Sequence, residues 1–277
     1  MWRYYWRRYR ERKIALFGLL LFLSLLLGTV MGPYLIERDP TAVDISNRLS
    51  PPNKNHLLGT DPLGRDNLSR IIWGARISMS VGLVTVIIGL IVGTFIGLVS
   101  GFYRGWLDKI LMRCMDAFLT FPPMLLAIAL MAGFGISVRN IMIALGIVYT
   151  PRFARLIRGS TLSVVERDYV TAATAMGARG MRILFGHLLP NVIAPIFVQA
   201  SYSFGRAIIA EAGLSFLGVG VRPPNPSWGL MLSDARGYLQ QAPWYPIFPG
   251  VAIMLTVLAI NLIGDGLRDA FDPKLKV

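Results

Sequence analysis

The chain has 277 residues, of which 54% are hydrophobic and 16% are charged, and its mean hydropathy is +0.56. A soluble domain usually has about 25% charged residues, and so apolar a soluble chain would leave too much apolar surface in water. Composition all but excludes a soluble enzyme, excludes a disordered chain, and indicates an integral membrane protein whose net charge of +13 flanks membrane helices rather than binding nucleic acid.

Six apolar runs are candidates for membrane spans, which need about 20 residues each. The first covers residues 14–36 and follows a segment with six Arg or Lys. It is too long for a cleavable signal peptide, so we expect an uncleaved signal-anchor helix. The other runs are residues 77–103, 117–138, 140–151 extended to Arg158, 190 to about 219, and the part of 237–264 that begins near Ile247.

Basic residues predict the orientation of these spans. Residues 1–13, 103–116, 152–190 and 265–277 contain 18 Lys or Arg, whereas the segments between them on the opposite side contain nine. Because basic loops stay in the cytoplasm, both termini are expected there. We therefore expect an anchor helix with an outer loop over 1–76, the main transmembrane domain over 77–268, and a cytoplasmic tail over 269–277.

The inner loop between the fourth and fifth runs is the most informative stretch. Residues 166–190 read ERDYVTAATAMGARGMRILFGHLLP. Its alanines predict a helix over 167–176 that Gly177 ends, followed by a second short helix over 181–189 that Pro190 ends. Such a helical hairpin suits insertion into a groove of another protein, and the alternative is a helix pair lying on the membrane surface.

Two features inside the spans are candidates for function. Gly89, Gly93, Gly97 and Gly101 form a ladder on one helix face, which allows close helix packing with either a partner subunit or another helix of this chain. Arg206 and Glu211 lie in the fifth run, where a charge near the bilayer centre costs at least about 2.5–3.5 kcal/mol. Five residues apart, they do not face one another well. We expect them to line or gate a route, or else to pair with other helices.

Catalytic patterns are absent from the sequence. It has no G-x-x-x-x-G-K-[ST] loop for nucleotide phosphates and no metalloprotease, serine hydrolase or dithiol motif. With one cysteine and two histidines, we expect no catalytic residue, metal site or cofactor in this chain. Energy for transport must then come from another polypeptide or from an ion gradient.

Four stretches resemble a known family. Residues 166–190 resemble the "EAA" loop of ABC importer permeases, with Thr171 where that family usually has Glu. Residues 59–76, 211–229 and 261–273 resemble the dipeptide/oligopeptide/nickel group of type I ABC importer permeases, specifically the C subunit of its permease pair. The resemblance runs from about residue 10 to the C-terminus.

This resemblance implies an all-α fold with six transmembrane helices in the plasma membrane of a prokaryote. It implies that the loop over about 162–189 couples to a cytoplasmic ATPase. The residues that carry this coupling role would be Thr171, Ala172, Ala173, Gly177, Arg179, Leu188 and Pro190.

The implied partners are a second homologous permease, two cytoplasmic ABC ATPases that bind ATP and Mg, an extracytoplasmic solute-binding protein and membrane lipid. The implied function is ATP-driven import of di- or oligopeptides, with nickel or a nickel chelate as the alternative substrate. A self-sufficient secondary transporter or channel is the rival from another class. It would need intramembrane ionisable groups, for which only Arg206 and Glu211 qualify.

Overall fold

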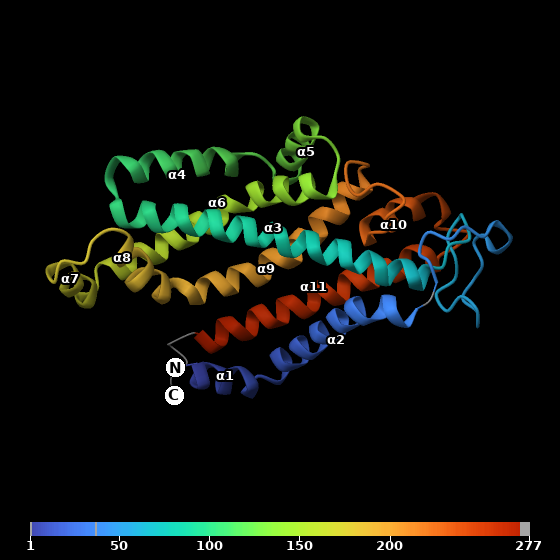
Figure 1. Cartoon of the computed structure of the whole chain (residues 1–277), viewed down its shortest axis with the longest axis horizontal. Coiled ribbons are helices and arrows are strands. Elements are labelled where there is room, and N and C mark those ends of the chain that lie inside the picture. The colour runs from blue at the N-terminus through green and yellow to red at the C-terminus, as the bar shows by residue number, and fades with distance from the viewer. Residues whose placement is uncertain (1, 37, 272–277) are drawn as a thin grey trace.

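The structure, a computed structural model of the chain, describes residues 2–36 and 38–271. These residues form a bundle of long helices (Figure 1). Five helices are long and apolar enough to contain a membrane span: α2 (Lys13–Leu35), α3 (Asn67–Tyr103), α6 (Val138–Val165), α9 (Leu189–Phe216) and α11 (Trp244–Phe271). For the described residues, the membrane protein indicated by composition and the all-α fold implied by the family resemblance are both confirmed.

The third predicted span, over 117–138, is a bent pair of helices in the structure. α4 (Gly105–Thr120) and α5 (Pro123–Phe134) pass the length and hydropathy test together, but they are bent by 97°. The bend lies at Pro122 and Pro123, which have no N–H to bond the last carbonyls of α4, so a new helix begins there. The predicted run over 117–138 starts too late, because the charged first half of this span is already helical.

Two other spans are longer than the sequence indicates. α3 begins at Asn67, where the Asp66 carboxylate accepts a hydrogen bond from the Ser69 amide, and it runs unbroken across residue 76. Arg76 is accommodated in it because its guanidinium lies 5.0 Å from the Trp73 ring centre and bonds the Thr29 carbonyl. α6 continues through Pro151 to Val165, so the fourth run is a full span and not a short one.

The predicted end of a helix at Pro190 is wrong. The second helix of the inner loop continues from α8 through the π-helical turn η2 directly into α9, with Pro190 in the first turn of α9. A proline inside a helix clashes with the carbonyl four residues before it. The wider π turn relieves such crowding, so the chain stays helical from Met181 to Phe216.

Short elements close the two ends of the bundle. They are α1 (Trp2–Glu11), η1 (Ile45–Asn47), α7 (Asp168–Ala175), α8 (Met181–Ile183), η2 (Leu184–Leu188), α10 (Trp228–Ala235) and η3 (Arg236–Tyr238). α1, α7 and α8 lie at one end, and the loop before α3 lies with α10 at the other (Figure 1). The predicted tail over 269–277 falls largely outside the described residues.

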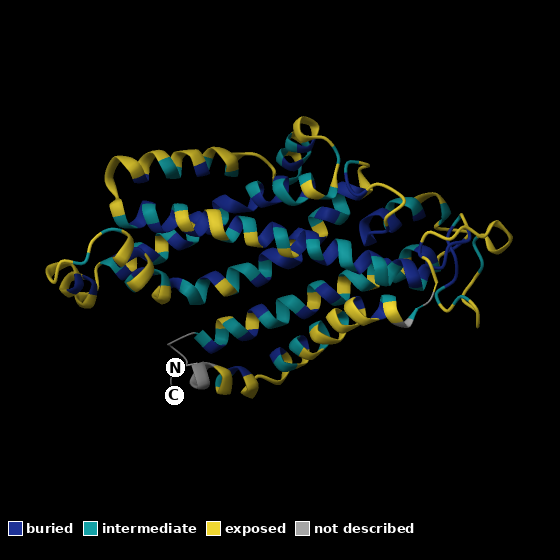
Figure 2. Ribbon diagram, in the orientation of Figure 1, coloured by how far each residue is buried: buried dark blue, intermediate teal, exposed yellow. Residues whose placement is uncertain are grey.

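The glycine ladder of α3 lies against α6 of the same chain. A Cβ added at Gly93 would lie 2.5 Å from the Phe153 Cβ and 2.7 Å from the Thr150 carbonyl oxygen, and one at Gly97 would lie 2.6 Å from the Ala154 oxygen. The nearest neighbours of Gly89 and Gly101 also belong to α6. The ladder is therefore an internal helix contact, and burial concentrates where α3, α6 and α9 meet (Figure 2).

Candidate functional site

The inner loop forms a hairpin that stands out at one end of the bundle (Figure 1). α7 is anchored by Val170, which is 3% exposed and belongs to a cluster of buried apolar residues, and by Ala173, which is 4% exposed. The members of that cluster are Leu98, Ile157, Val164, Val170, Ile183, Leu184, Leu188, Val192 and Ile196. One face of a short helix is thus fixed to α3, α6 and α9, and the other is free to face a partner.

The free face carries small side chains, one apolar side chain and an arginine. Thr171, Ala172 and Arg179 are exposed, and Met176 is 84% exposed. Gly177, at φ +89°, turns the chain after α7 as predicted, and the Ala178 amide then bonds the Ala173 carbonyl. Such a face offers close approach, with one flexible apolar side chain at its tip.

The predicted coupling residues therefore divide into two groups. Thr171, Ala172, Gly177 and Arg179 lie on the exposed side of the hairpin, as does Pro190 in the first turn of α9. Ala173 and Leu188 are buried and hold the hairpin to the bundle.

Glu211 is enclosed in a cluster of serines where α3, α9 and α10 meet. Its side chain is fully buried, and it accepts hydrogen bonds from the hydroxyls of Ser78 at 3.0 Å, Ser215 at 2.9 Å and Ser227 at 3.0 Å. We call these four residues the serine cluster. In this cluster, three neutral hydroxyl groups donate hydrogen bonds to the buried carboxylate of Glu211.

Each serine of the serine cluster also caps a piece of backbone. Ser78 Oγ accepts the Trp228 amide, Ser215 Oγ accepts the Val221 amide and Ser227 Oγ accepts the Leu230 amide. A hydroxyl can donate one hydrogen bond and accept others at the same time. Each serine can therefore accept a backbone N–H while it donates its hydrogen to Glu211. The carboxylate thereby orients three hydroxyls and fixes the start of α10, whose N-cap is Ser227.

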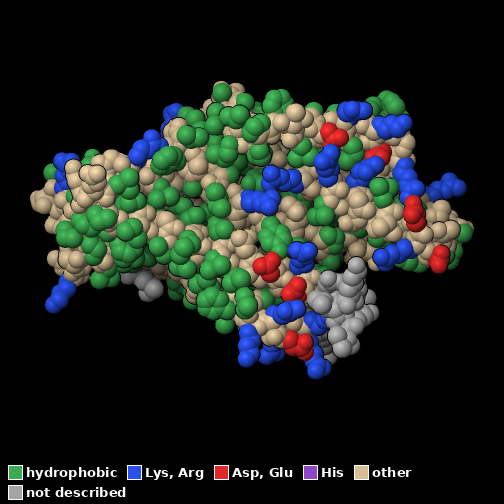
Figure 3. Space-filling model, turned by 180° about the vertical axis from the view of Figure 1, so that it is seen from behind, with side chains coloured by type: hydrophobic (Ala, Val, Ile, Leu, Met, Phe, Trp, Pro, Cys, Tyr) green, Lys and Arg blue, Asp and Glu red, His purple; other side chains and the backbone are tan. Residues whose placement is uncertain are grey.

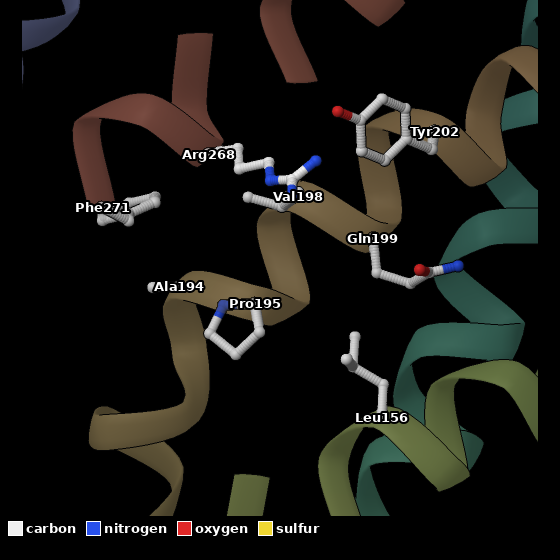
Figure 4. Close-up of a pocket in the computed structure, with 8 residues that line it drawn as sticks. All are labelled: Leu156, Ala194, Pro195, Val198, Gln199, Tyr202, Arg268 and Phe271. Atoms are coloured by element: carbon white, nitrogen blue, oxygen red, sulfur yellow. The ribbon is translucent and has the colours of Figure 1, made fainter. Parts of the chain in front are cut away.

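Arg206 lies on a different side of α9 from Glu211 and is exposed, in keeping with the expectation that the two do not face one another. Residues 199, 202 and 206 recur at helical spacing along one face of α9. Gln199 and Tyr202 line an open groove of about 420 Å³ between α6, α9 and α11. Leu156 and Arg268 border the same groove (Figure 4).

Ion pairs that attach α4 to α6 were not foreseen from the sequence. Arg158 of α6 donates from Nε and Nη2 to both carboxylate oxygens of Asp108, at 2.6 Å each, and the Ser100 hydroxyl bonds the same carboxylate. Arg155 pairs with Asp116 two turns further along α4, at 2.7 Å. A two-point Arg–carboxylate contact fixes orientation as well as distance, so these pairs hold the bent span in place.

The outer end is closed by a second set of charges. Asp61 accepts the amides of Leu63 and Arg65 and the Nε of Arg65, at 2.8, 2.9 and 2.6 Å. Arg70, which is fully buried, lies 3.5 Å from Asp61 and 3.9 Å from Asp234. Burial raises the pKa of Asp234, and the positive charge of Arg70 opposes that rise. The outer loop is thus tied to α3 and α10.

The partners of Glu211 and of Asp108 are the functional residues that sequence reasoning missed. Ser78 lies 133 residues from Glu211, and Arg158 lies 50 residues from Asp108, so spacing along the chain gave no signal. The acidic residues of α4 were the available clue, because charges in an apolar region need partners.

Two family models match this chain. Residues 93–277 match the binding-protein-dependent transport system inner membrane component, and residues 1–52 match the N-terminal TM domain of oligopeptide transport permease C. Together they cover α2, the hairpin and every part of the chain except residues 53–92.

Named relatives extend over almost the whole chain. A dipeptide transport system permease protein of Alkalihalophilus pseudofirmus is 46% identical over 99% of this chain and 90% of its own length. A glutathione transport system permease protein of Pectobacterium atrosepticum is also 46% identical, over 99% and 92%. A di/tripeptide transport system permease protein of Pseudomonas aeruginosa is 45% identical over 98% and 92%.

The fold is also that of a solved importer. An inward-facing structure of the MetNI methionine ABC transporter superposes with a TM-score of 0.62 at 19% identity, covering 73% of this chain and 96% of that chain. This confirms the type I ABC permease fold. The chain belongs to the family of inner membrane components of binding-protein-dependent transport systems, as a multi-pass permease of the peptide-transporter group.

Proposed function

We propose that this chain is one of two permease subunits of an ATP-driven importer of short peptides, and that the hairpin formed by α7 and α8 is its contact with a cytoplasmic ATPase. The observation that carries the proposal is the division of α7 into a buried anchor, Val170 and Ala173, and an exposed face, Thr171 and Ala172. The names of the 42–46% identical relatives supply the substrate class.

Movement at the hairpin would reach the route through α9. Val170 of α7 belongs to the same buried cluster as Ile183, Leu184 and Leu188, and these three belong to the helical stretch that continues into α9. A displacement of the hairpin by the ATPase therefore shifts α9 and the groove beside it. Alternating access needs such a two-state bundle, whose balance both nucleotide and binding protein can change.

The face of α9 that carries Gln199, Tyr202 and Arg206 is our choice for the lining of the route. It is open along the groove of about 420 Å³, and Arg206 is exposed in a span where a lipid-facing charge is costly. A water-filled path shared with the second permease would remove that cost. ATP hydrolysis, the binding of ATP and Mg and substrate capture are assigned to the partner chains.

The test is a bulky charge on the exposed face of α7. Ala172→Arg should reduce ATP-dependent peptide uptake in reconstituted importer, and co-purification of the ATPase, by at least about tenfold, since a buried unpaired charge at an interface costs more than 1.4 kcal/mol. Normal uptake with a normal ATPase content would refute the assignment of the hairpin.

The matched control is Ala42→Arg, an equal substitution at an exposed alanine of the outer loop. It should leave the ATPase content unchanged. Peptide uptake by this chain alone, in liposomes without ATP, would instead establish the rival reading as a secondary transporter.

A further inference from the structure

The junction of α1 and α2 packs onto the inner end of α11 and leaves a groove of about 520 Å³ beside it. A Cβ added at Gly266 of α11 would lie 2.3 Å from the Ala15 Cβ and 2.7 Å from Tyr9 Cε2. The Tyr9 hydroxyl, in a side chain that is 5% exposed, donates to the Ala15 carbonyl at 3.0 Å. The wall of the groove is therefore fixed by close packing. We call this groove the elbow groove.

The elbow groove is lined by charges of both signs. Arg12 and Lys13 come from the junction, and Glu11, Asp265 and Asp269 supply three carboxylates. Figure 3 shows acidic and basic side chains side by side at the lower edge of the rear face, next to a largely apolar surface. A ligand that suits such a lining carries both a negative and a positive group.

Apart from Asp265, which accepts the Tyr202 hydroxyl, the charges of the elbow groove are only loosely paired. Arg12 Nη2 lies 3.4 Å from Asp269 Oδ2, with side chains 55% and 41% exposed, and Arg7 lies 3.4 Å from Glu11. Exposed pairs of this kind contribute little to stability. Exchanging them for contacts with a ligand therefore costs little.

The elbow groove lies at the level of the lipid headgroups. The apolar span of α2 is Lys13–Tyr34, 22 residues, which is about 33 Å of helix and matches a hydrocarbon core of about 30 Å. Lys13 thus marks one boundary of the core. Ile14, Ala15 and Leu262 line the groove on its hydrocarbon side, and only 17% of the α2 span is buried, so lipid can reach it.

We propose that the elbow groove binds the headgroup of an aminophospholipid, phosphatidylethanolamine, with its phosphate at Arg12 and Lys13 and its ammonium at the three carboxylates. Phosphatidylglycerol fits the groove less well, because its headgroup is anionic and carboxylates outnumber cations there. Phosphatidylcholine keeps the phosphate but has no N–H to donate to the carboxylates. The lipid would hold α1 and α2 to α11 from the membrane side.

The experiment is native mass spectrometry of the purified full chain with equal amounts of phosphatidylethanolamine, phosphatidylcholine and phosphatidylglycerol of identical acyl chains. We expect phosphatidylethanolamine to bind about tenfold more tightly than either of the others, the effect of one good charged hydrogen bond. Equal binding of the three lipids, or a preference for phosphatidylglycerol, overturns the proposal.

Variants locate the site. Asp265→Asn with Asp269→Asn should reduce the preference over phosphatidylcholine to less than about threefold. Because Asp265 also accepts the Tyr202 hydroxyl at 2.5 Å, Glu11→Gln with Asp269→Asn is a second variant that leaves this bond intact. The control, Asp39→Asn with Arg48→Gln in the outer loop, should keep the full preference. An unchanged preference in both groove variants places the lipid elsewhere and refutes the elbow groove.

Discussion

Glu211 accepts hydrogen bonds from three serine hydroxyls, and it is the acceptor that each of their hydrogens uses. Each serine oxygen already accepts a backbone amide, from Val221, Trp228 or Leu230. Loss of the carboxylate would leave up to three buried hydroxyl hydrogens unpaired, and such groups cost about 1–3 kcal/mol each. The Glu211 side chain therefore holds the start of α10 to α9.

Glu211→Gln should lower the free energy of unfolding in detergent by about 1–3 kcal/mol, because the amide nitrogen cannot accept a hydrogen bond. Glu211→Leu should lower it further, since no acceptor remains. Chemical or thermal unfolding of the purified variants measures both. A Glu211→Leu chain as stable as the parent would show that the serine cluster does not hold the bundle.

Asp44 predicts a pH dependence of the outer loop. The Asn47 side-chain amide donates to its carboxylate at 2.7 Å, and this hydrogen bond holds the pKa of Asp44 below its usual range. The folded loop then binds fewer protons than the unfolded one, so its stabilisation is complete above about pH 4 and is lost as the pH falls through the lowered pKa. Hydrogen exchange at the Ser46 amide should show this loss, and Asp44→Asn should abolish it.

At the scale of helices, the contact between α3 and α6 depends on the missing side chain of Gly93. Gly93→Ala would bring a methyl group within 3.0 Å of three atoms of α6, and overpacking of this kind costs about 1–3 kcal/mol. Gly159→Ala is the control, because a Cβ there meets no described atom within 4 Å. We expect a lower unfolding temperature for the first variant and an equal or higher one for the second.

The strength of the ion pair between Asp108 of α4 and Arg158 of α6 can be measured. Arg158→Lys keeps the charge but loses the two-point contact with Asp108, so α4 should become more sensitive to protease. A double-mutant cycle with Asp108→Asn and Arg158→Gln should give a coupling energy of order 1–3 kcal/mol. Additive effects of the two single changes would mean that the pair does not attach the helix.

These helices also show how far the sequence reaches. Hydropathy located α2, α3, α9 and α11, because each contains an apolar run of about 20 residues, which is long enough to cross the membrane. Hydropathy missed the first part of α4, because it scores Asp108 and Asp116 as charges. It takes no account of the α6 arginines that pair with them. The helix α7 and its end at Gly177 were predicted from the alanines and the glycine, whereas the serine cluster depends on pairings between distant segments that no local pattern contains.

At the scale of the whole molecule, the predicted orientation is open to a direct measurement. α7 and the outer loop lie at opposite ends of the bundle (Figure 1), and the distribution of Lys and Arg predicts that the α7 end is cytoplasmic. After replacement of the exposed Cys114 by serine, Lys54→Cys should react with an impermeant thiol reagent in intact cells. Arg179→Cys should react only after the membrane is opened, and the reverse pattern would invert the topology.

The helical stretch from Met181 to Phe216 has 36 residues, a length of about 54 Å, and it has the hairpin at one end and Glu211 near the other. Because Val170 packs at one end of this stretch and Glu211 is bonded at the other, we expect a displacement of the hairpin to be transmitted to the start of α10. Thermodynamic reciprocity then requires the converse. Docking of a solute-binding protein at the outer end would then change the affinity of the ATPase for the hairpin. Such coupling would delay ATP hydrolysis until a substrate is delivered.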